Sequence, residues 1–84
     1  MEYKEILINR ITSLCKEKNL SINKLAKMSG LKQSTLDNIV HGNTVYAQGR
    51  TIHMIANGFG MTYGEFVSTP EFDNYSFADE EDKE

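Results

Sequence analysis

The stretch that decides the fold runs from Ser21 to Gly42 and reads SINKLAKMSGLKQSTLDNIVHG. It divides at Gly30 into two short segments, each with apolar residues at helical spacing. Ser21 can accept a hydrogen bond from the first turn of a helix beginning at Ile22, and Gly30 can take the positive φ that ends it. The stretch therefore predicts two short helices, over about 21–41, that are joined by a tight turn and cross closely.

The residues of this stretch are of two kinds, apolar ones for packing and polar ones for the exposed face. Ala26 has the small side chain that a close helix crossing needs. The larger apolar side chains should hold both helices on a common core, and they are Leu25, Leu31, Leu36 and Ile39. Polar side chains are left for the outer face of the second helix: Gln33, Ser34, Asp37, Asn38 and His41. Lys32 precedes this helix and lacks the side chain of a good N-cap, so the predicted start of the helix has little local support.

Helices are also predicted on both sides of this pair. Residues 3–18 contain no Gly or Pro and repeat apolar residues at helical spacing. After a loop over 43–49, a fourth apolar stripe follows, and it contains Ile52, Ile55, Ala56 and Phe59. Thr62 and Glu65 then have the spacing of a capping box, which opens a fifth helix that stops before Pro70. No strand-like alternation or repeat is present, so we expect an all-α fold.

Length and composition favour a binding module. The 84 residues make one small domain, and only 39% of them are apolar, so the core must be lean. Cys15 is the only cysteine, which excludes an intramolecular disulfide and a cysteine-rich zinc site. No signal-peptide pattern or apolar run of membrane-spanning length is present. We therefore expect a soluble cytoplasmic protein with no membrane partner.

The charge is distributed unevenly along the chain. Residues 1–64 contain eight basic and four acidic side chains, giving +4. Residues 65–84 contain eight acidic side chains and one lysine, giving −7, so the whole chain has a net charge of −3. A mildly basic body is compatible with phosphate contacts, whereas the acidic end should be partly disordered.

Several motifs, taken in order, resemble one known family. Ala26, Gly30 and Leu31 have the Ala-x-x-x-Gly-Leu spacing, and the Leu36 and Ile39 pair is followed by the ending Ile-Val-His-Gly. Residues 51–56 read TIHMIA, and residues 59–66 read FGMTYGEF. Over about residues 4–67 the chain resembles the phage repressor/Cro family, also called Xre-type regulators. The resemblance implies a compact five-helix, lambda-repressor-like domain over 1–67, with 68–84 as an aromatic and then acidic extension.

The resemblance also implies residue roles. The third helix would enter the DNA major groove with its first residues at base edges. Base readers would then be Gln33, Ser34 and Asn38. Contacts to the DNA backbone would come from Ser21, Asn23, Lys32, Thr35, Asn43, Thr44 and Arg50. The loop over 43–49 is poorer in Lys and Arg than in many relatives.

Other chemistry has little support in the sequence. No triad or paired carboxylates have a catalytic spacing, so we expect no enzyme activity, cofactor or small-molecule ligand. Cys15 and the three methionines Met28, Met54 and Met61 are interpreted as core residues. His41 and His53 lack the companions of a metal site. The glycines at 58, 60 and 64 do not have the dinucleotide-loop spacing and follow a helix rather than a strand.

The sequence therefore predicts a sequence-specific regulator of transcription, acting as a repressor on double-stranded DNA. A homodimer would form through the fifth helix and the aromatic stretch, at Phe66, Val67, Phe72, Tyr75 and Phe77. The alternative is a protein-interaction module of the antitoxin or antirepressor kind. The acidic end has two open interpretations: a solubilising segment, or one that competes with phosphates for the basic face.

Overall fold

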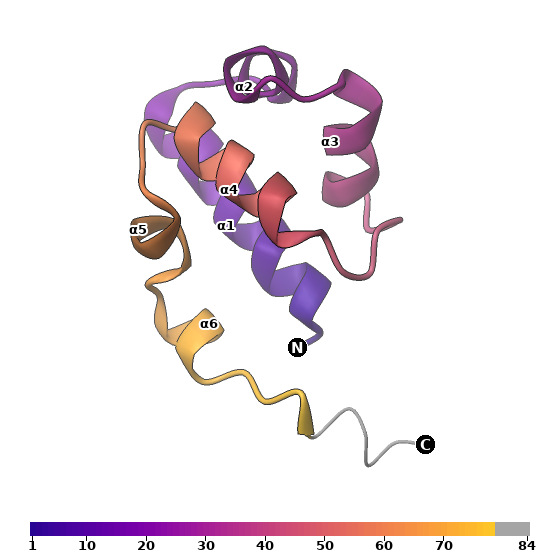
Figure 1. Ribbon diagram of the computed structural model, residues 1–84, viewed down its shortest axis with the longest axis vertical. Coiled ribbons are helices and arrows are strands. Elements are labelled where there is room, and N and C mark those ends of the chain that lie inside the picture. Colours follow the sequence, from indigo (N-terminus) through magenta and orange to yellow (C-terminus); the bar gives the residue numbers. More distant parts are fainter. Residues whose placement is uncertain (79–84) are drawn as a thin grey trace.

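The computed structural model describes residues 1–78, and within them the chain is all-helical (Figure 1). There are six helices in this part of the chain: α1 (Tyr3–Lys18), α2 (Ile22–Ser29), α3 (Gln33–Val40), α4 (Gly49–Gly58), α5 (Tyr63–Val67) and α6 (Pro70–Asp73). The all-α prediction is confirmed. The acidic residues beyond 78, where disorder was expected, lie outside the described residues.

Local chemistry sets the helix ends. Ser21 Oγ accepts from the backbone N–H of Lys24 at 3.0 Å, which caps α2. Asn19 and Gly30 end α1 and α2 in the left-handed conformation, with φ of 55° and 74°. Thr62 and Glu65 form the predicted capping box, and the Thr62 N–H donated to the Glu65 carboxylate lowers the pKa of Glu65. The ends at Ser21, Gly30 and Thr62 confirm the sequence reasoning, because each depends only on neighbouring residues.

The helices are arranged around α1 and α4. Figure 1 shows α2 across one end of this pair, α3 on one side, and α5 and α6 on the other. Helix α2 packs against both α3 and α4, while α1 packs against α3 and α4 against α5. The two helices of the decisive stretch are thus supported from behind, which leaves the far side of α3 open.

The core contains residues from the first five helices. Its largest fully buried side chains are Phe66, Ile11, Leu25, Leu36 and Ile55. Cys15 is also buried, as expected, and burial raises the pKa of its thiol. Met54 and Met61 are partly buried, but Met28 is 52% exposed, so its interpretation as a core residue was wrong. Met28 follows Leu25 by three residues, a spacing that favoured burial, but the packing of α2 on α3 and α4 buries Leu25, Ala26 and Ser29 and leaves Met28 in solvent.

Arg10 joins α1 to the end of α5. Its Nε donates to the Phe66 carbonyl at 2.8 Å, and its Nη2 donates to the Glu65 carbonyl at 3.1 Å. The guanidinium also lies 5.7 Å from the centre of the Phe66 ring. The last carbonyls of a helix have no partner within it, so a cation there satisfies both their hydrogen bonding and the helix dipole.

The extension after residue 67 contains a sixth helix that the sequence analysis did not predict. Thr69 caps α6, and Phe72 of this helix packs against the core. Beyond it, Tyr75 and Phe77 join Tyr3 of α1 and Tyr46 of the 43–48 loop in a cluster of rings, with centroids 4.9–6.1 Å apart. The five helices expected over residues 1–67 are all present, and the sixth lies in the extension that follows them. The division of the chain at residue 67 stays a prediction.

Candidate nucleic-acid interface

The outer face of α3 is polar and exposed. Leu36 and Ile39 point inward and are 0% and 3% exposed, while Gln33, Ser34 and Asn38 are all exposed. Because residues four apart lie above one another on a helix, these polar side chains form two rows. One row starts at Gln33 and the next starts at Ser34. All three predicted base readers therefore reach solvent from a single element.

The first row is joined by hydrogen bonds. Gln33 Nε2 donates to Asp37 Oδ1 at 3.0 Å, and His41 Nδ1 lies 2.7 Å from the Asp37 carbonyl. Asp37 is half-buried, whereas Gln33 and His41 are exposed. The Asp37 carboxylate is thus paired locally, with a side chain of its own helix. His41, at the end of the same row, was not among the predicted site residues.

The turn before α3 brings it close to α2. The Leu31 N–H donates to the Ala26 carbonyl at 3.0 Å while Gly30 takes its positive φ. A Cβ on Gly30 would lie 3.7 Å from Met54 Cε of α4, so the turn also rests on that helix. Lys32, the N-cap of α3, is exposed and makes no side-chain capping bond, as expected from its chemistry. The start of α3 is therefore held by packing and not by its cap.

Three helix starts contribute further donors. Ser21 caps α2, and Asn23 in the first turn is exposed. Neither α3 nor α4 has a side-chain cap, so the first N–H groups of both helices are left available to a ligand. Sequence reasoning identified the start of α2 but missed the start of α4. The signal in the sequence was Gln48, a residue type that seldom caps a helix, directly before Gly49. Its side chain makes no capping hydrogen bond to the first turn of α4.

The loop between α3 and α4 is tied to α1. Lys4 Nζ donates to the Gly42 carbonyl at 3.1 Å, and the Asn43 N–H donates to the Asn38 carbonyl at 2.9 Å. The side chain of Asn43 is exposed, and Thr44, like Thr35 on α3, is half-buried. These contacts hold the loop residues that are predicted to contact the DNA backbone directly after α3.

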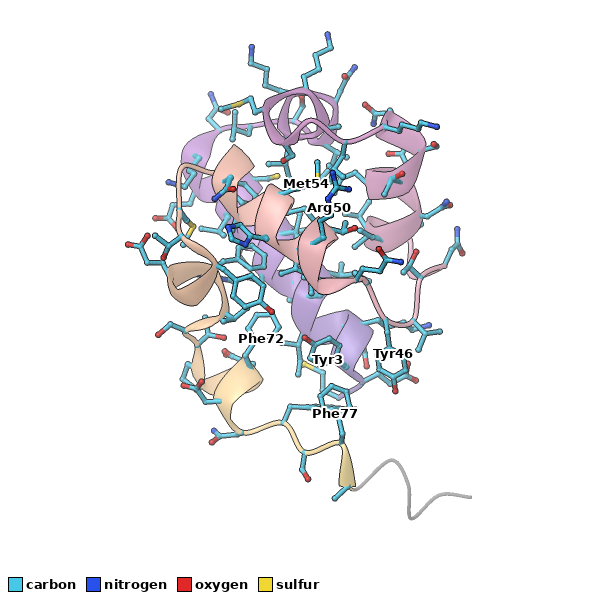
Figure 2. All side chains as sticks on the ribbon, in the orientation of Figure 1. Tyr3, Tyr46, Arg50, Met54, Phe72 and Phe77 are labelled. Atoms are coloured by element: carbon cyan, nitrogen blue, oxygen red, sulfur yellow. The ribbon has the colours of Figure 1, made fainter. Side chains whose placement is uncertain are left out.

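Arg50 is the second residue of α4 and lies beside the pair formed by α2 and α3 (Figure 2). Figure 2 shows Arg50 and Met54 on the same side of α4, turned toward the turn between α2 and α3. The guanidinium is exposed and has no hydrogen-bond or ion-pair partner among residues 1–78. A cation without a partner beside an exposed polar helix suits a phosphate ligand.

The charges around the site are almost all positive. Between Glu17 and Glu65 the sequence contains one acidic residue, Asp37. The basic side chains in the same interval are Lys18, Lys24, Lys27, Lys32 and Arg50. In the described part of the chain the one salt bridge joins Lys4 to Glu2, at 3.8 Å, so it leaves these five cations unpaired. The helix pair therefore has a positive local field despite the negative net charge of the chain.

The predicted dimer residues lie on α5, on α6 and in the stretch after α6, where Tyr75 and Phe77 contact Tyr3, and Phe77 also contacts Tyr46 of the loop after α3. Phe66 is 0% exposed and fills the chain's own core, so its assignment to a dimer interface was wrong. Val67, Phe72 and Tyr75 are half-buried, and Phe77 is 50% exposed. Short-range spacing could not separate these cases, because burial of Phe66 depends on α1 and α4 packing over it. Only the remaining four residues have surface to offer to a second copy.

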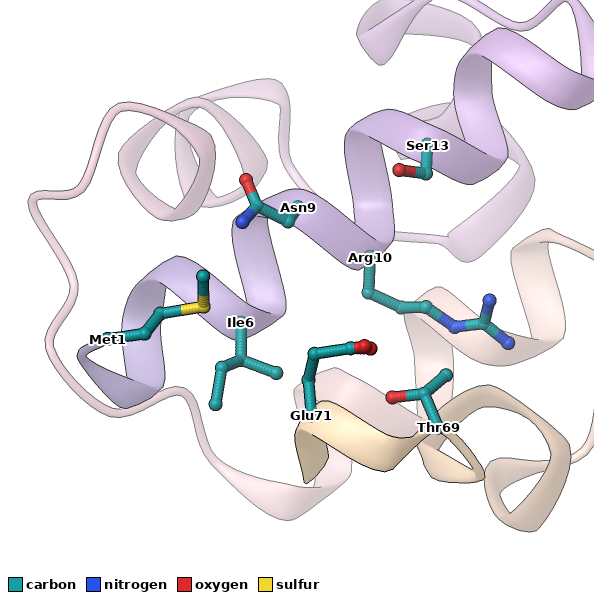
Figure 3. Close-up of a pocket in the computed structure, with 7 residues that line it drawn as sticks. All are labelled: Met1, Ile6, Asn9, Arg10, Ser13, Thr69 and Glu71. Atoms are coloured by element: carbon teal, nitrogen blue, oxygen red, sulfur yellow. The ribbon is translucent and has the colours of Figure 1, made fainter. Parts of the chain in front are cut away.

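A pocket of about 370 Å³ lies between α1 and the start of α6 (Figure 3). Its walls mix apolar and polar groups, and they are formed by Met1, Ile6, Asn9, Arg10, Ser13, Thr69 and Glu71. None of the predicted DNA-contacting residues lines it. The Arg10 side chain already binds the end of α5.

Two other kinds of feature are absent from residues 1–78. No group of three or more His, Cys, Asp or Glu side chains there could hold a metal ion. No helix in this part of the chain has the length and apolar character needed to cross a bilayer.

Comparisons with known proteins point to one family. A family model described as a Cro/C1-type HTH DNA-binding domain matches residues 10–71, which is most of the chain. Among solved structures, the chain is similar to one titled "Crystal structure of the prophage Lp1 protein 11". That match has a TM-score of 0.77 and 25% sequence identity, and it covers 89% of this chain and 100% of the other. No curated protein matches the chain significantly.

Proposed function

Because the chain belongs to the family of Cro/C1-type helix-turn-helix DNA-binding domains, we propose that it is a sequence-specific repressor of transcription. Members of this family are DNA-binding regulators and not enzymes, which agrees with the expected lack of catalytic groups. The likeness to a prophage protein supports a phage or bacterial origin, and membership of a DNA-binding family supports a cytoplasmic location.

In the proposed complex, α3 lies in the major groove of double-stranded DNA. The observation that supports this most directly is the exposed polar face of α3, with Gln33, Ser34 and Asn38 unobstructed in the described chain. A helix fits the major groove, and the amides of Gln and Asn can pair bidentately with the N6 and N7 atoms of adenine. Ser34 can donate to or accept from either kind of base edge.

Contacts to the DNA backbone would surround this reading face. The start of α2 would offer N–H groups beside Ser21 and Asn23, and the start of α4 would offer its own beside Arg50. The complete proposed set is Ser21, Asn23, Lys32, Thr35, Asn43, Thr44 and Arg50. About four to six phosphate contacts per monomer would make the affinity depend steeply on salt.

Selection of bound duplexes from a random pool tests this proposal. We expect a preferred sequence that contains adenine. Gln33→Ala and Asn38→Ala should each weaken binding to it by about 1–3 kcal/mol and relax the preference at one position. Arg50→Ala should weaken all sequences alike, because it contacts phosphate. If both α3 variants kept the full preference, α3 would not be the reading helix.

A dimer would extend the site that is read. One such module reads few base pairs, and regulators of this type usually bind two half-sites about one helical turn apart. Val67, Phe72, Tyr75 and Phe77 are the proposed contact residues. A palindrome in the selected duplexes, together with subunit exchange between two tagged copies, would support the dimer. Lack of exchange at high concentration would count against it.

A second function is favoured by one observation. Val45, Tyr46 and Phe77 are each at least 50% exposed, and Tyr46 and Phe77 are in ring contact. Exposed apolar side chains in contact with one another are typical of protein-binding surfaces. The chain would then act as an antitoxin-like or antirepressor-like module. A titration with random duplex at low salt separates the two functions, because lack of binding even there would favour the protein partner.

A further inference from the structure

Asp37 is an unusual residue for the face on which it lies. It is the only acidic residue between Glu17 and Glu65, and it lies on α3 among residues proposed to enter a groove lined by phosphates. A carboxylate there weakens the attraction between α3 and DNA. We therefore ask which favourable contribution of Asp37 to DNA recognition offsets this repulsion.

The structure shows what Asp37 contacts. Its Oδ1 accepts a hydrogen bond from Gln33 Nε2 at 3.0 Å, one helical turn away. An ionised carboxylate can only accept hydrogen bonds, so the nitrogen of the Gln33 amide must face Asp37 and the oxygen must face away. His41 Nδ1, 2.7 Å from the Asp37 carbonyl, lies beside the next turn of the same row. The carboxylate therefore fixes which way the Gln33 amide is turned.

A fixed amide has consequences for base recognition. The Gln33 nitrogen has a second hydrogen, which remains free to donate, while its oxygen remains free to accept. Adenine presents an acceptor, N7, next to a donor, N6, whereas guanine presents two acceptors, N7 and O6. A fixed donor and acceptor match adenine but leave the Gln33 oxygen opposed to guanine O6. The negative charge of Asp37 also disfavours an edge made only of acceptors.

We propose that Asp37 is a positioning residue that makes Gln33 select adenine over guanine. This inference rests on the proposed function, since it concerns how α3 reads DNA. Asp37 need not touch a base, because it acts through the orientation of the Gln33 amide. It also lowers affinity for DNA of any sequence, so its contribution is to specificity and not to binding strength.

The test compares wild type with Asp37→Asn, which has nearly the same shape but can also donate. Affinity is measured on the selected duplex and on a copy with guanine in place of the adenine assigned to Gln33. We expect Asp37→Asn to reduce the preference for adenine by about 5- to 100-fold and to bind random duplex more tightly. Asp37→Glu keeps the charge and the acceptor and should retain most of the preference. Thermal unfolding of each variant reports on any change in the fold.

A double-substitution cycle separates positioning from a direct contact. If Asp37 acts through Gln33, then Asp37→Asn made together with Gln33→Ala should change the preference no further than Gln33→Ala does alone. Independent losses from the two substitutions would overturn the proposal, as would an unchanged preference in Asp37→Asn. If wild type shows no sequence preference on any duplex, the proposed function and this inference both fail. If wild type keeps a preference that Asp37→Asn leaves intact, this inference fails alone.

Discussion

At the scale of single residues, the two glycines at the ends of α4 are a matched pair. A Cβ on Gly58 would collide with Ser29 Oγ and would lie 3.1 Å from both the Ser29 Cβ and its backbone nitrogen. A Cβ on Gly49 would meet nothing within 4 Å. We expect Gly58→Ala to lower the free energy of unfolding by about 1–3 kcal/mol through overpacking. Gly49→Ala should raise it by about 0.4–1 kcal/mol, and urea denaturation measures both.

Ser29 provides a control for the first of these substitutions. Its Oγ is buried and has no hydrogen-bond partner among the described residues, which is unfavourable for a polar group. Ser29→Ala should therefore leave stability unchanged or raise it, and it should relieve part of the loss in Gly58→Ala. The backbone of Ser29 remains close, so the relief cannot be complete. Equal losses in Gly58→Ala and Gly49→Ala would show that the α2–α4 approach is looser than the structure has it.

Ionisation of the Tyr3 phenol should lower the stability of the fold at alkaline pH. Burial, with a smaller effect of Tyr63, raises the pKa of Tyr3 above its ordinary value of 10.0. A raised pKa means that folding favours the neutral phenol, so this contribution is complete below pH 10.0 and is lost as the pH rises through the folded-state pKa. We expect the melting temperature to fall over this range in wild type and to fall less in Tyr3→Phe. Tyr63→Phe serves as the comparison, and an identical decline in Tyr3→Phe would contradict the assignment.

At the scale of elements, two arginines should have opposite effects. Arg10 binds two carbonyls at the end of α5, while Arg50 at the start of α4 binds no described group. We expect Arg10→Ala to lower the free energy of unfolding by about 1.5–3 kcal/mol and to leave sequence preference intact. Arg50→Ala should leave stability within about 0.5 kcal/mol of wild type and weaken DNA binding. Thermal unfolding and a duplex titration of both variants check this, and a stability loss in Arg50→Ala would contradict it.

The same scale shows what the sequence could predict. The ends at Gly30 and Thr62 depend on neighbouring residues, so spacing and capping chemistry found them. The exposed face of α3 was also found, because Leu36 and Ile39 fix which side is buried. Helix α6 was missed because four residues give too little periodicity to detect.

Long-range contacts were the other part of the structure that the sequence could not predict. The bond from Arg10 to the end of α5 joins residues 56 and 55 positions apart, and no local pattern indicates it. The ring cluster of Tyr3, Tyr46, Tyr75 and Phe77 likewise brings three distant segments together. The orientation of Gln33 required the position of an atom on Asp37, which spacing alone allowed but could not establish.

At the scale of the whole molecule, the extension crosses from the α5 side to the loop that follows α3. Figure 2 shows Tyr3, at the start of α1, between Phe72 and Tyr46, with Phe77 below it. Phe77 lies 6.0 Å from Tyr46, ring centre to ring centre, and Tyr46 is two residues after Thr44, a proposed backbone contact. Ring contacts therefore hold the end of the described chain beside the proposed DNA-binding loop.

This placement bears on the acidic segment that follows, residues 79–84, which carries five acidic side chains and one lysine. Six residues can span at most about 20 Å, a distance comparable with the width of this small domain. Its charge can therefore reach the field of the basic face, and we expect deletion after Ala78 to strengthen binding to random duplex by about 2- to 10-fold at low salt. The gain should vanish near 1 M salt, where screening acts within about 3 Å.

The control for this deletion is Phe77→Ala in the full chain, which keeps the acidic charge but removes its attachment to Tyr46. If the segment competes with phosphates from a fixed position, Phe77→Ala should strengthen binding in the same direction but by less than the deletion does. Unfolding curves of both variants should show whether the ring cluster also stabilises the fold. Equal affinity of the deletion variant and wild type at every salt concentration would mean that the acidic residues serve solubility alone, because a competing segment must change the salt dependence of binding.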